Sequence, residues 1–540
     1  MTATTLRAGG RAPDPHDERP PRPRWVRRWP GRLAGLSVLA AASAAVRWGG
    51  RELSLWVDEG ISVGLASHGL GEIPALLSGD GSPPLYFVLL HLWMRLFGPS
   101  EVSVRALSLV LAVVAVPVAF WAARRLFGQR AGWMAATLAA FSSYLTLASR
   151  DARMYPLLVV VALVAVSAFV QVLVQRRRAM TTILALALAA VAYTHNWGLF
   201  LVAALALAVP VCLRATERGA RRAVALDAAL AFGGATLVYL PWVPTLAGQV
   251  RRTGAPWSRT PGTGDIAAAV HSVLGSPWVS LVLAAVLGGV VLGHRRRAWS
   301  GQAVAAAVLS GVATATLALA WLSSQVEPAW SARYFGALLA PVLLVSALAL
   351  ARAGRAGVLA LVAVVAMWTL PTIGPWSATS APAPKSNVRS LAGALAPVLG
   401  PGDVVMTTQF EQLPLFAYYL GTGLRYAEPS GVVADPLAAD WRHAKERLAA
   451  ADPAAVLDQE VERLRRGGHV VIACPRLFTD ASDLAWYRLM DTNCVAALNA
   501  LAGHPEMVRV WGPWPPRWVD EEGASMAVTL YRRAGAGAGP

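Results

Sequence analysis

The sequence predicts a polytopic α-helical membrane protein with a soluble α/β domain at its C-terminal end. Hydrophobic residues make up 56% of the 540 residues and charged residues only 15%, whereas soluble domains have about 45–50% apolar and about 25% charged residues. Up to residue 371, apolar blocks alternate with short arginine clusters, which is the pattern of membrane spans. After residue 385 this pattern gives way to shorter strand-like and helix-like stretches.

The net charge of +17 comes almost entirely from arginine, and Lys385 and Lys445 are the only lysines. In a soluble protein this charge would indicate a nucleic-acid partner. Here the arginines lie between predicted spans, where they orient a protein in the bilayer, so we expect no nucleic acid. Phosphate-binding loops of the G-x-x-x-x-G-K-[ST] or G-x-G-x-x-G type are absent from the sequence, which argues against nucleotide-driven chemistry. The arginine, alanine and glycine usage is typical of a GC-rich bacterial genome, such as an actinobacterial one.

The chain begins with residues 1–30, a Pro- and Arg-rich segment that we expect to be a disordered, basic cytoplasmic tail. A first span is predicted at Leu33–Trp48, opening a membrane domain at residues 31–371. This span is short, and Ala42–Ala45 resembles a signal-peptidase site, so cleavage is an open alternative. Either way, the loop at residues 49–101 is delivered outside.

Arginine asymmetry sets the predicted topology, because cytoplasmic loops carry the excess of positive charge. The segments assigned to the inside hold 23 Arg, and the outside loops before residue 372 hold 8. The inside loops are marked by Arg124, Arg125 and Arg130; Arg176–Arg178; Arg214, Arg218, Arg221 and Arg222; Arg295–Arg297; and Arg352 and Arg355. With the first span, eleven spans are predicted, the others near 102–122, 131–148, 157–174, 180–194, 198–213, 223–241, 276–293, 302–322, 335–351 and 357–371.

One apolar block, Pro83–Gly98, does not fit as a span, because a crossing there would place every later arginine cluster outside. We expect it to form an amphipathic helix on the outer leaflet, starting at Pro83 or Pro84, with Trp93 at the interface.

Residues 372–540 are predicted to form an extracytoplasmic α/β domain. Strands are expected at Gly402–Thr407, at Gly468–Ala473 and, as a final pair, near 507–511 and 526–532. Helical stretches are expected near 387–398, 410–420 and 437–466.

Cys474 and Cys494 both lie in this domain, where an oxidising compartment favours a disulfide. A pair of buried free thiols is an equally weighted alternative. Cys212 lies near a cytoplasmic helix end and is expected to be inert.

Polar residues suited to chemistry gather on the predicted outer face, and ionisable residues at membrane depth are candidates for function. Each group also has a structural interpretation: solvated loop acids, an ion-pair cluster around Arg150–Arg153, a hydrogen-bonded histidine, or an arginine that reaches toward headgroups. Their shared side of the membrane favours the functional interpretation. The groups are Asp58 and Glu59; Arg150, Asp151, Arg153 and Tyr155; Tyr193, Thr194, His195 and Asn196; and Glu327, Arg333 and Tyr334.

A transferase on that face would need a donor that diffuses in the membrane, such as a sugar on a polyprenyl phosphate. The departing phosphate needs positive charge, which Arg333, Arg150 or Arg153 could supply. The acceptor hydroxyl needs a base, and one carboxylate is sufficient. Displacement in a single step would invert the anomeric centre.

Several motifs resemble one family in order along residues 50–350. The motifs are SLWVDEGIS, SPPLYFVLLHLWMRLFGPSEVSVRALS, RRLFG, SRDARMYPL, YTHNWGLFLV and SARYFGALLAP. They are similar to GT-C membrane glycosyltransferases of the protein O-mannosyltransferase and aminoarabinose-transferase type. The Asp-Glu pair followed by Pro-Pro-Leu-Tyr is fairly specific, whereas the later motifs are weak alone.

The resemblance implies a GT-C-like fold and a polyprenyl-phosphate-sugar donor, with Asp58 as general base and Glu59 in support. On one helix these two side chains would project about 100° apart, so they cannot face one hydroxyl equally. Metal dependence varies in this superfamily; the sequence shows no dedicated ligand set, and a divalent metal stays possible. The expected substrate-contacting residues are Asp151, Tyr155, His195, Asn196, Tyr86 and Tyr334.

The sequence therefore predicts an inverting transferase, of mannosyl or arabinosyl type, that modifies a cell-envelope glycan, lipid or protein. A lipid or polysaccharide transporter is one alternative, although it would need charged residues in mid-span and the predicted spans have almost none. A non-catalytic envelope scaffold is the other. Neither the sugar nor the acceptor is identified by the sequence.

Overall fold

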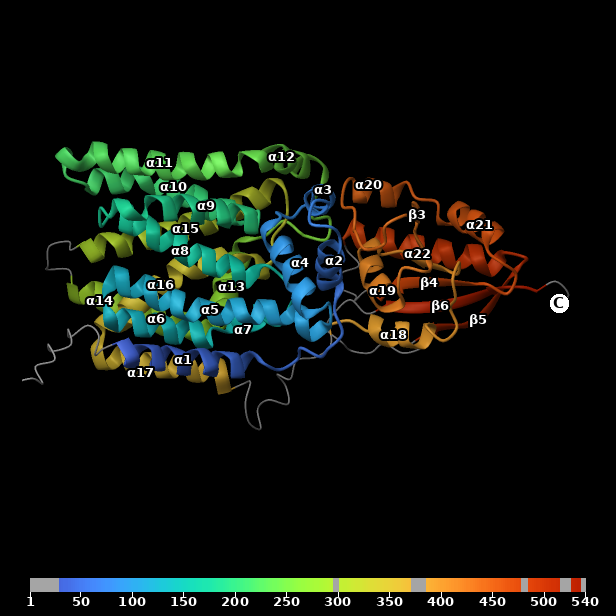
Figure 1. Ribbon diagram of the computed structural model, residues 1–540, viewed down its shortest axis with the longest axis horizontal. Helices are drawn as coiled ribbons and strands as arrows, with labels where there is room; N and C mark the ends of the chain where they lie inside the picture. The colour runs from blue at the N-terminus through green and yellow to red at the C-terminus, as the bar shows by residue number, and fades with distance from the viewer. Residues whose placement is uncertain (1–28, 295–300, 371–384, 477–483, 515–525, 536–540) are drawn as a thin grey trace, which may run out of the picture.

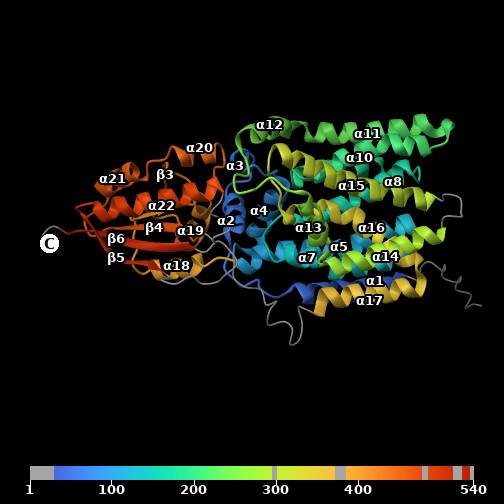
Figure 2. The same cartoon turned by 180° about the vertical axis from the view of Figure 1, so that it is seen from behind.

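The computed structural model describes residues 29–294, 301–370, 385–476, 484–514 and 526–535. The predicted tail up to residue 28, the Arg295–Arg297 loop and the domain boundary at 371–384 lie outside the described residues. Figure 1 shows two parts, a bundle of helices that run side by side and an α/β domain at one end of it. Figure 2 shows the same arrangement from behind.

The bundle helices follow the predicted spans closely. One predicted span is interrupted, since 131–148 is divided at Ser142. Helix α13 (Thr263–Leu274), which no predicted span covered, precedes α14 with a bend of 85°. The bundle comprises α1 (Trp29–Arg47), α5 (Glu101–Phe127), α6 (Gln129–Phe141), α7 (Ser143–Ala148), α8 (Tyr155–Leu173), α9 (Thr181–Thr194), α10 (Gly198–Ala215), α11 (Arg221–Tyr239), α14 (Pro277–His294), α15 (Gly301–Val326), α16 (Gly336–Arg352) and α17 (Gly354–Thr369). A short helix, α12 (Val243–Arg252), follows α11.

Within the described residues, six helices are long and apolar enough to cross a membrane, or seven if α13 and α14 count as one span. Helix α9 and helix α17 belong to shorter apolar segments. The membrane fold is therefore confirmed, while the count of eleven spans stays a prediction. Helices α8 and α16 form the centre of the bundle, because most of their residues are buried on every side.

Helix α1 is packed into the bundle through a buried arginine. The Arg47 guanidinium donates to the carbonyl oxygens of Ala139 and Ala140 at 2.9 and 2.7 Å. These carbonyls end α6, where the break at Ser142 leaves them without a helical partner. Arg47 thus caps α6 from a neighbouring helix.

The first loop is not extended chain but three short helices, α2 (Val57–Ser67), α3 (Ile73–Asp80) and α4 (Leu85–Phe97). They lie between the bundle and the α/β domain (Figure 1). Helix α4 starts after Pro84, as predicted, and crosses the ends of the bundle helices instead of running with them. The Trp93 indole donates to the Ser103 carbonyl at 2.8 Å, which ties α4 to the start of α5.

The C-terminal domain contains a six-stranded mixed sheet in the order β3-β2-β1-β4-β6-β5 within the described residues. Strand β1 is parallel to β2 and β4, with Val404 opposite Val470, and the remaining pairs are antiparallel. The strands are β1 (Val404–Thr407), β2 (Arg425–Glu428), β3 (Gly431–Val433), β4 (His469–Pro475), β5 (Met507–Trp514) and β6 (Met526–Arg533). The helices are α18 (Val388–Leu395), α19 (Leu413–Leu420), α20 (Ala444–Ala449), α21 (Pro453–Arg463) and α22 (Ala485–Gly503).

The predicted strands β1, β4, β5 and β6 are confirmed. The single helix predicted near 437–466 is wrong, because the chain forms two helices that are separated at Ala450–Asp452. Asp452 caps α21 by accepting from the amides of Ala454 and Ala455, and Pro453 occupies the first helical position. Strands β2 and β3 and helix α22 were not predicted.

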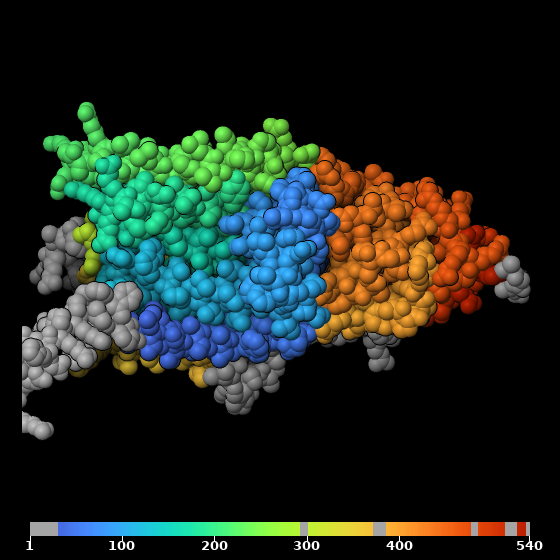
Figure 3. Space-filling view, in the orientation of Figure 1, coloured from blue at the N-terminus to red at the C-terminus, as the bar shows by residue number. Residues whose placement is uncertain are grey.

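The α/β domain packs directly on α2, and Figure 3 shows no gap between the two parts on this face. A Cβ atom at Gly64 would lie 2.1 Å from the Leu437 carbonyl oxygen, so only glycine permits this approach. The Tyr419 hydroxyl accepts from the Leu55 amide at 2.8 Å, and Arg389 pairs with Glu101 at 3.0 Å. The domain therefore fixes the helix that carries Asp58.

A disulfide joins Cys474 on β4 to Cys494 on α22, with 5.7 Å between their Cα atoms. This bond ties the unpredicted helix α22 to a central strand of the sheet. Cys212 is a buried free cysteine in the bundle.

Candidate active site

A cavity of about 890 Å³ lies where the bundle, the first-loop helices and the C-terminal domain meet. Both parts of the protein supply its walls. The bundle side includes Trp56, Asp58, Asp80, Arg153, His195, Asn196, Gln249, Trp257, Arg333 and Tyr334. The domain side includes Gln409, Glu411, Trp441, Arg476, Trp486 and Tyr487.

Asp58 lies in the first turn of α2 and reaches this cavity. Its carboxylate oxygen Oδ2 is 2.9 Å from Nη1 of Arg333, which belongs to the 3-10 turn Ala332–Phe335 before α16. The Arg333 guanidinium also lies over the rings of Trp56 and Trp257, at 5.2 and 5.7 Å from their centres. These aromatic faces hold the cation in position without neutralising its charge.

Glu59 is the next residue, yet it is fully buried and does not line the cavity. Its two oxygens accept from Nε and Nη2 of Arg105 at 2.7 and 2.6 Å, and Oε1 also accepts from the Ala152 amide. Arg105 donates further to the carbonyls of Arg51, Leu53 and Ser54, the segment that leads into α2. The Glu59–Arg105 pair therefore organises the chain around Asp58.

Two further cations line the cavity beside Asp58. Nη1 of Arg153 donates to the Ser62 hydroxyl at 3.1 Å and to the Asp58 main-chain carbonyl at 3.3 Å. The Lys385 ammonium is 2.5 Å from Asp151 Oδ1 and 4.8 Å from the centre of the Trp56 ring. Arg153 was a predicted site residue, whereas Lys385 was not.

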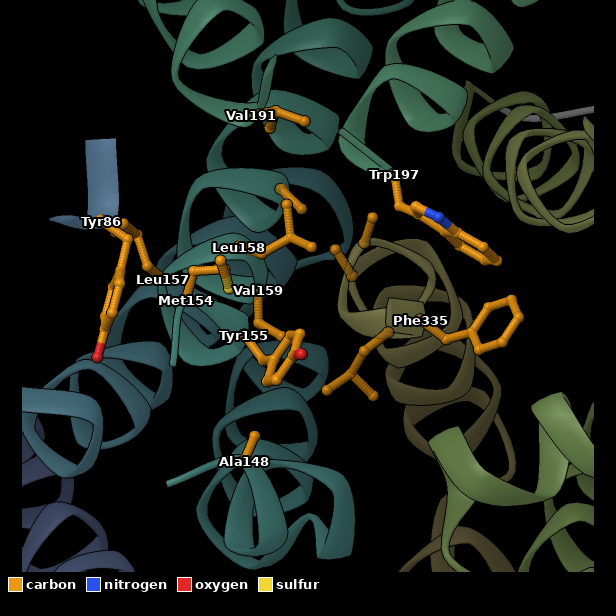
Figure 4. Close-up of a cluster of buried hydrophobic side chains, with 14 of the residues drawn as sticks. Tyr86, Ala148, Met154, Tyr155, Leu157, Leu158, Val159, Val191, Trp197 and Phe335 are labelled. Atoms are coloured by element: carbon orange, nitrogen blue, oxygen red, sulfur yellow. The ribbon is translucent and has the colours of Figure 1, made fainter. Parts of the chain in front are cut away.

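Besides Glu59, four predicted residues do not line the cavity. Arg150 and Asp151 are not among its lining residues, and Asp151 is held by Lys385. Tyr86 and Tyr155 are buried in the hydrophobic core that Figure 4 shows. The Tyr86 hydroxyl lies 3.4 Å from the Ser108 hydroxyl.

His195, Asn196 and Tyr334 do line the cavity. The His195 Nδ1 atom accepts from the Trp197 amide at 3.0 Å. Burial, with the charges of Arg153 and Arg333, lowers the pKa of His195 to about 3. The imidazole is therefore neutral at physiological pH and is poorly suited to act as a general acid. Asn196 Nδ2 donates to the Gly81 carbonyl at 2.8 Å, which anchors the loop between α3 and α4.

Sequence reasoning missed two carboxyl groups in the cavity wall. Asp80 ends α3, and Glu411 lies in the 3-10 turn Phe410–Gln412 of the C-terminal domain. Burial raises the pKa of Glu411 to about 8, and the charge of Asp58 acts in the same direction. Burial also raises the pKa of Asp80. Among the described residues, no three His, Cys, Asp or Glu side chains form a group that could hold a metal ion.

Residues 81–195 match the dolichyl-phosphate-mannose-protein mannosyltransferase family. No curated protein sequence is significantly similar to the chain.

Solved structures of similar fold include ArnT from Cupriavidus metallidurans bound to undecaprenyl phosphate, with TM-score 0.57 and 14% identity over 94% of this chain and 99% of that one. The archaeal oligosaccharyltransferase AglB from Archaeoglobus fulgidus, in complex with an inhibitory peptide and a dolichol-phosphate, has TM-score 0.54 and 11% identity over 88% and 72%. The arabinofuranosyltransferase AftD from Mycobacteria has TM-score 0.50 and 15% identity over 94% of this chain and 40% of that one.

These similarities define the fold of the protein. The chain has the GT-C fold of membrane glycosyltransferases, with a C-terminal α/β domain. The predicted resemblance to GT-C glycosyltransferases is thereby confirmed, and the match at residues 81–195 covers the Pro-Pro-Leu-Tyr and SRDARMYPL motifs.

Proposed function

We propose that the protein is a membrane glycosyltransferase that moves a sugar from a polyprenyl-phosphate donor to a hydroxyl group of a cell-envelope acceptor. The observation that carries this proposal is the cavity at the end of the bundle, where Asp58 is surrounded by Arg333, Arg153 and Lys385. An acid and several cations in one cavity match the needs of a reaction that removes a proton and releases a phosphate. The undecaprenyl phosphate bound to ArnT is a donor-type lipid in the same fold.

The donor phosphate is assigned to Arg333, with Arg153 as its neighbour. In the ligand-free structure Arg333 pairs with Asp58, so an arriving phosphate would compete for the same guanidinium. A phosphate has more acceptor oxygens than one carboxylate and forms strong charge-assisted hydrogen bonds. Donor binding would therefore draw Arg333 away from Asp58 and leave this carboxylate able to accept a proton.

Asp58 is assigned as the general base of a single displacement. The acceptor oxygen gives its proton to the Asp58 carboxylate and forms a bond to the anomeric carbon. The bond between that carbon and the phosphate oxygen breaks on the opposite side, and its electron pair leaves with the polyprenyl phosphate. The anomeric configuration is inverted. Glu59 supports this step by holding Arg105 and the chain before α2.

The acceptor is assigned to the C-terminal domain side of the cavity, on the extracytoplasmic face of the plasma membrane. This side presents Gln409, Glu411, Trp441 and Tyr487, which can contact a glycan, a lipid headgroup or a protein hydroxyl. A transporter is less well supported, because the titratable residues that line the cavity lie at one end of the bundle.

The direct test is sugar transfer by the purified full chain in nanodiscs. Radiolabelled undecaprenyl-phosphate mannose and decaprenyl-phosphate arabinose are supplied with a cell-envelope extract as acceptor. We expect label in the extract and release of polyprenyl phosphate, both lost in Asp58→Ala. A wild-type protein that binds undecaprenyl phosphate but transfers neither sugar, or an Asp58→Ala protein of unchanged activity, would contradict the proposal.

A further inference from the structure

The turn that follows α3 is contacted by side chains from two distant parts of the bundle. Asn196 Nδ2 donates to the Gly81 carbonyl at 2.8 Å. Gln249 of α12 donates through Nε2 to the Ser82 carbonyl at 3.3 Å and to the Leu77 carbonyl at 2.9 Å. Both amide nitrogens are thus engaged by main-chain carbonyls, which fixes the direction of each amide oxygen.

The amide oxygens of these two residues lack a donor. Within the described residues, neither Asn196 Oδ1 nor Gln249 Oε1 has a hydrogen-bond partner. Gln249 is only 2% exposed, and both side chains belong to residues that line the cavity. A buried acceptor without a donor is costly. Rotating either amide would not help, because its nitrogen would then lose the carbonyl that it contacts. A bound molecule that donates hydrogen bonds would supply what this part of the wall needs.

Asp80 and Trp441 complete this part of the cavity wall. Asp80 ends α3 and is half-buried, and an ionised carboxylate only accepts hydrogen bonds. The Trp441 amide of the C-terminal domain donates to the Gly79 carbonyl at 2.9 Å, which places the indole beside the same turn. Trp486 stacks on this indole with 6.0 Å between ring centres, and Phe410 meets it edge-on at 5.1 Å. The ring orientation is therefore fixed, while Trp441 is half-buried and lines the cavity.

This part of the wall lies close to the arginine that is assigned to the donor phosphate. Asn196 lies between His195 and Trp197 in the sequence, and both of those rings contact the Tyr334 ring, with 4.9 and 5.2 Å between ring centres. Tyr334 directly follows Arg333. A group linked to a phosphate at Arg333 would therefore lie near Asn196.

The combination of oxygens and an indole suits a saccharide. Sugar hydroxyl groups donate hydrogen bonds to carboxylate and amide oxygens, and the C–H face of a sugar ring packs on an aromatic ring. A lipid tail has no donor to offer. A calcium ion fits less well, because it takes about six to eight oxygen ligands. Among the side chains that the structure describes, no three His, Cys, Asp or Glu residues form a group suited to a metal ion.

We propose a saccharide-binding subsite in this part of the cavity, formed by Asp80, Asn196, Gln249 and Trp441. The carboxylate and the two amide oxygens accept from hydroxyl groups of a sugar ring, and the indole covers one face of that ring. The sugar is either the one on the polyprenyl phosphate or a terminal sugar of a glycan acceptor, because both offer the same chemistry. The inference rests on the proposed function for these two sources, and it adds residues that decide which sugar is bound.

The experiment measures equilibrium binding to the purified full chain in nanodiscs, with no partner substrate present. One arm compares undecaprenyl-phosphate mannose and decaprenyl-phosphate arabinose with the same polyprenyl phosphates without a sugar. The other arm uses methyl mannoside and methyl arabinofuranoside, which carry no phosphate. The variants are Asp80→Ala and Trp441→Leu. Asp435→Ala is the matched control, because Asp435 is an acid of the C-terminal domain that pairs with His68 and does not line the cavity.

We expect the wild type and Asp435→Ala to gain affinity from the sugar of at least one probe. Asp80→Ala should reduce the affinity for that probe about tenfold, as expected for one hydrogen bond to a charged group. Its affinity for the sugar-free polyprenyl phosphates should be retained or rise, because removal of an acid reduces repulsion of the phosphate. Trp441→Leu should also weaken only sugar binding. If this variant is unstable, because Trp441 packs on Trp486, Asp80→Ala decides alone.

A loss confined to the sugar-bearing lipids would identify the donor sugar as the ligand, and a loss confined to the methyl glycosides would identify the acceptor sugar. An Asp80→Ala protein that binds every sugar probe as tightly as Asp435→Ala would overturn the proposal. So would a wild type that gains no affinity from a sugar in either arm, or an equal loss for probes with and without a sugar. A wild type that binds no polyprenyl phosphate would count against the proposed function instead, and the glycoside arm would still decide the subsite.

Discussion

Asp58 and Glu59 are adjacent in the sequence, yet the first turn of α2 turns them toward different surroundings. Asp58 is partly exposed to the cavity and faces Arg333, whereas Glu59 is enclosed by Arg105 and the Ala152 amide. Two identical functional groups thus acquire different roles from the helical rotation of about 100° per residue. Substitution at each position should therefore affect different properties.

Asp58→Asn should lower turnover by about 10²–10⁴-fold, the usual contribution of a positioned general base. The amide keeps the size and polarity of the side chain but cannot accept the proton. Donor binding should be retained or become tighter, because the donor is held by its phosphate and lipid tail and the amide no longer competes as an anion for Arg333. Transfer rates and donor affinity of the purified protein would measure both.

Glu59→Gln is the matched comparison, since it removes one charge from the buried pair with Arg105. We expect a clear loss of Tm, because breaking a buried ion pair typically costs about 3–5 kcal/mol, and a smaller effect on turnover of the folded protein. Near-normal turnover for Asp58→Asn beside an inactive, folded Glu59→Gln or Asp151→Asn would move the base to another residue.

Arg333→Lys keeps the positive charge but loses the planar fork that binds two oxygens and stacks on Trp56 and Trp257. Donor affinity and rate should both fall, and Arg333→Ala should reduce them further. The measurement is binding of undecaprenyl phosphate together with transfer kinetics. Unchanged affinity and rate in Arg333→Ala would assign this arginine to structure.

Glu411 should make the stability of the protein depend on pH. Its folded pKa is raised to about 8, above the usual carboxyl value, so the folded state binds the proton more tightly than the unfolded state. This contribution is fully present below about pH 4 and is lost as the pH rises through about 8. Between these limits, the Tm of Glu411→Gln should change less with pH than the Tm of the wild type. Glu446→Gln, at an exposed position of α20, should keep the wild-type slope.

At the scale of elements, the sequence predicted those with a strong hydrophobic pattern. Strands β1 and β4 have continuous runs such as Val470–Ala473 that are fully buried, and the bundle helices have long apolar stretches. Strands β2 and β3 were missed because they are only four and three residues long, and β2 also has mixed polarity. Their pairing depends on β1, which a local pattern does not reveal.

The site was predictable only in part, for a similar reason. Asp58, Arg153, His195 and Arg333 lie at ends of neighbouring spans, so a topology argument groups them. Lys385, Glu411 and the C-terminal aromatic residues reach the same cavity from segments far along the chain. Tertiary packing alone brings them there. The sequence indicated a role for Arg105 only weakly, because this arginine is a charged residue in an otherwise apolar helix.

The Cys474–Cys494 bond should be detectable by thiol labelling of denatured protein without reductant. Of the three cysteines, only Cys212 should react, and it serves as the internal control. Cys494→Ser should destabilise the C-terminal domain by about 3 kcal/mol, the value expected for a loop of this size. Three reactive thiols in protein purified under non-reducing conditions would reject the bond.

At the scale of the whole molecule, the bundle end that carries the cavity and the C-terminal domain should be extracytoplasmic. The described arginine clusters, at 124–130, 176–178, 214–222 and 352–355, belong to the connections at the opposite end. A phosphatase that is active only outside the cytoplasm should be active when fused after Gly374 and inactive when fused after Arg297. The reverse pattern would contradict the topology and the outer-face site with it.

The direct packing of the C-terminal domain on α2 has a consequence for biosynthesis. The helices that carry Asp58, Arg153 and Arg333 are translated and inserted before the last 150 or so residues leave the ribosome. Until those residues fold, the cavity has only one of its walls, and Gly64 has no Leu437 carbonyl to pack against. Under the proposed function, a nascent or truncated chain would occupy the bilayer without transferring sugar. Folding of the C-terminal domain would then be the final maturation step.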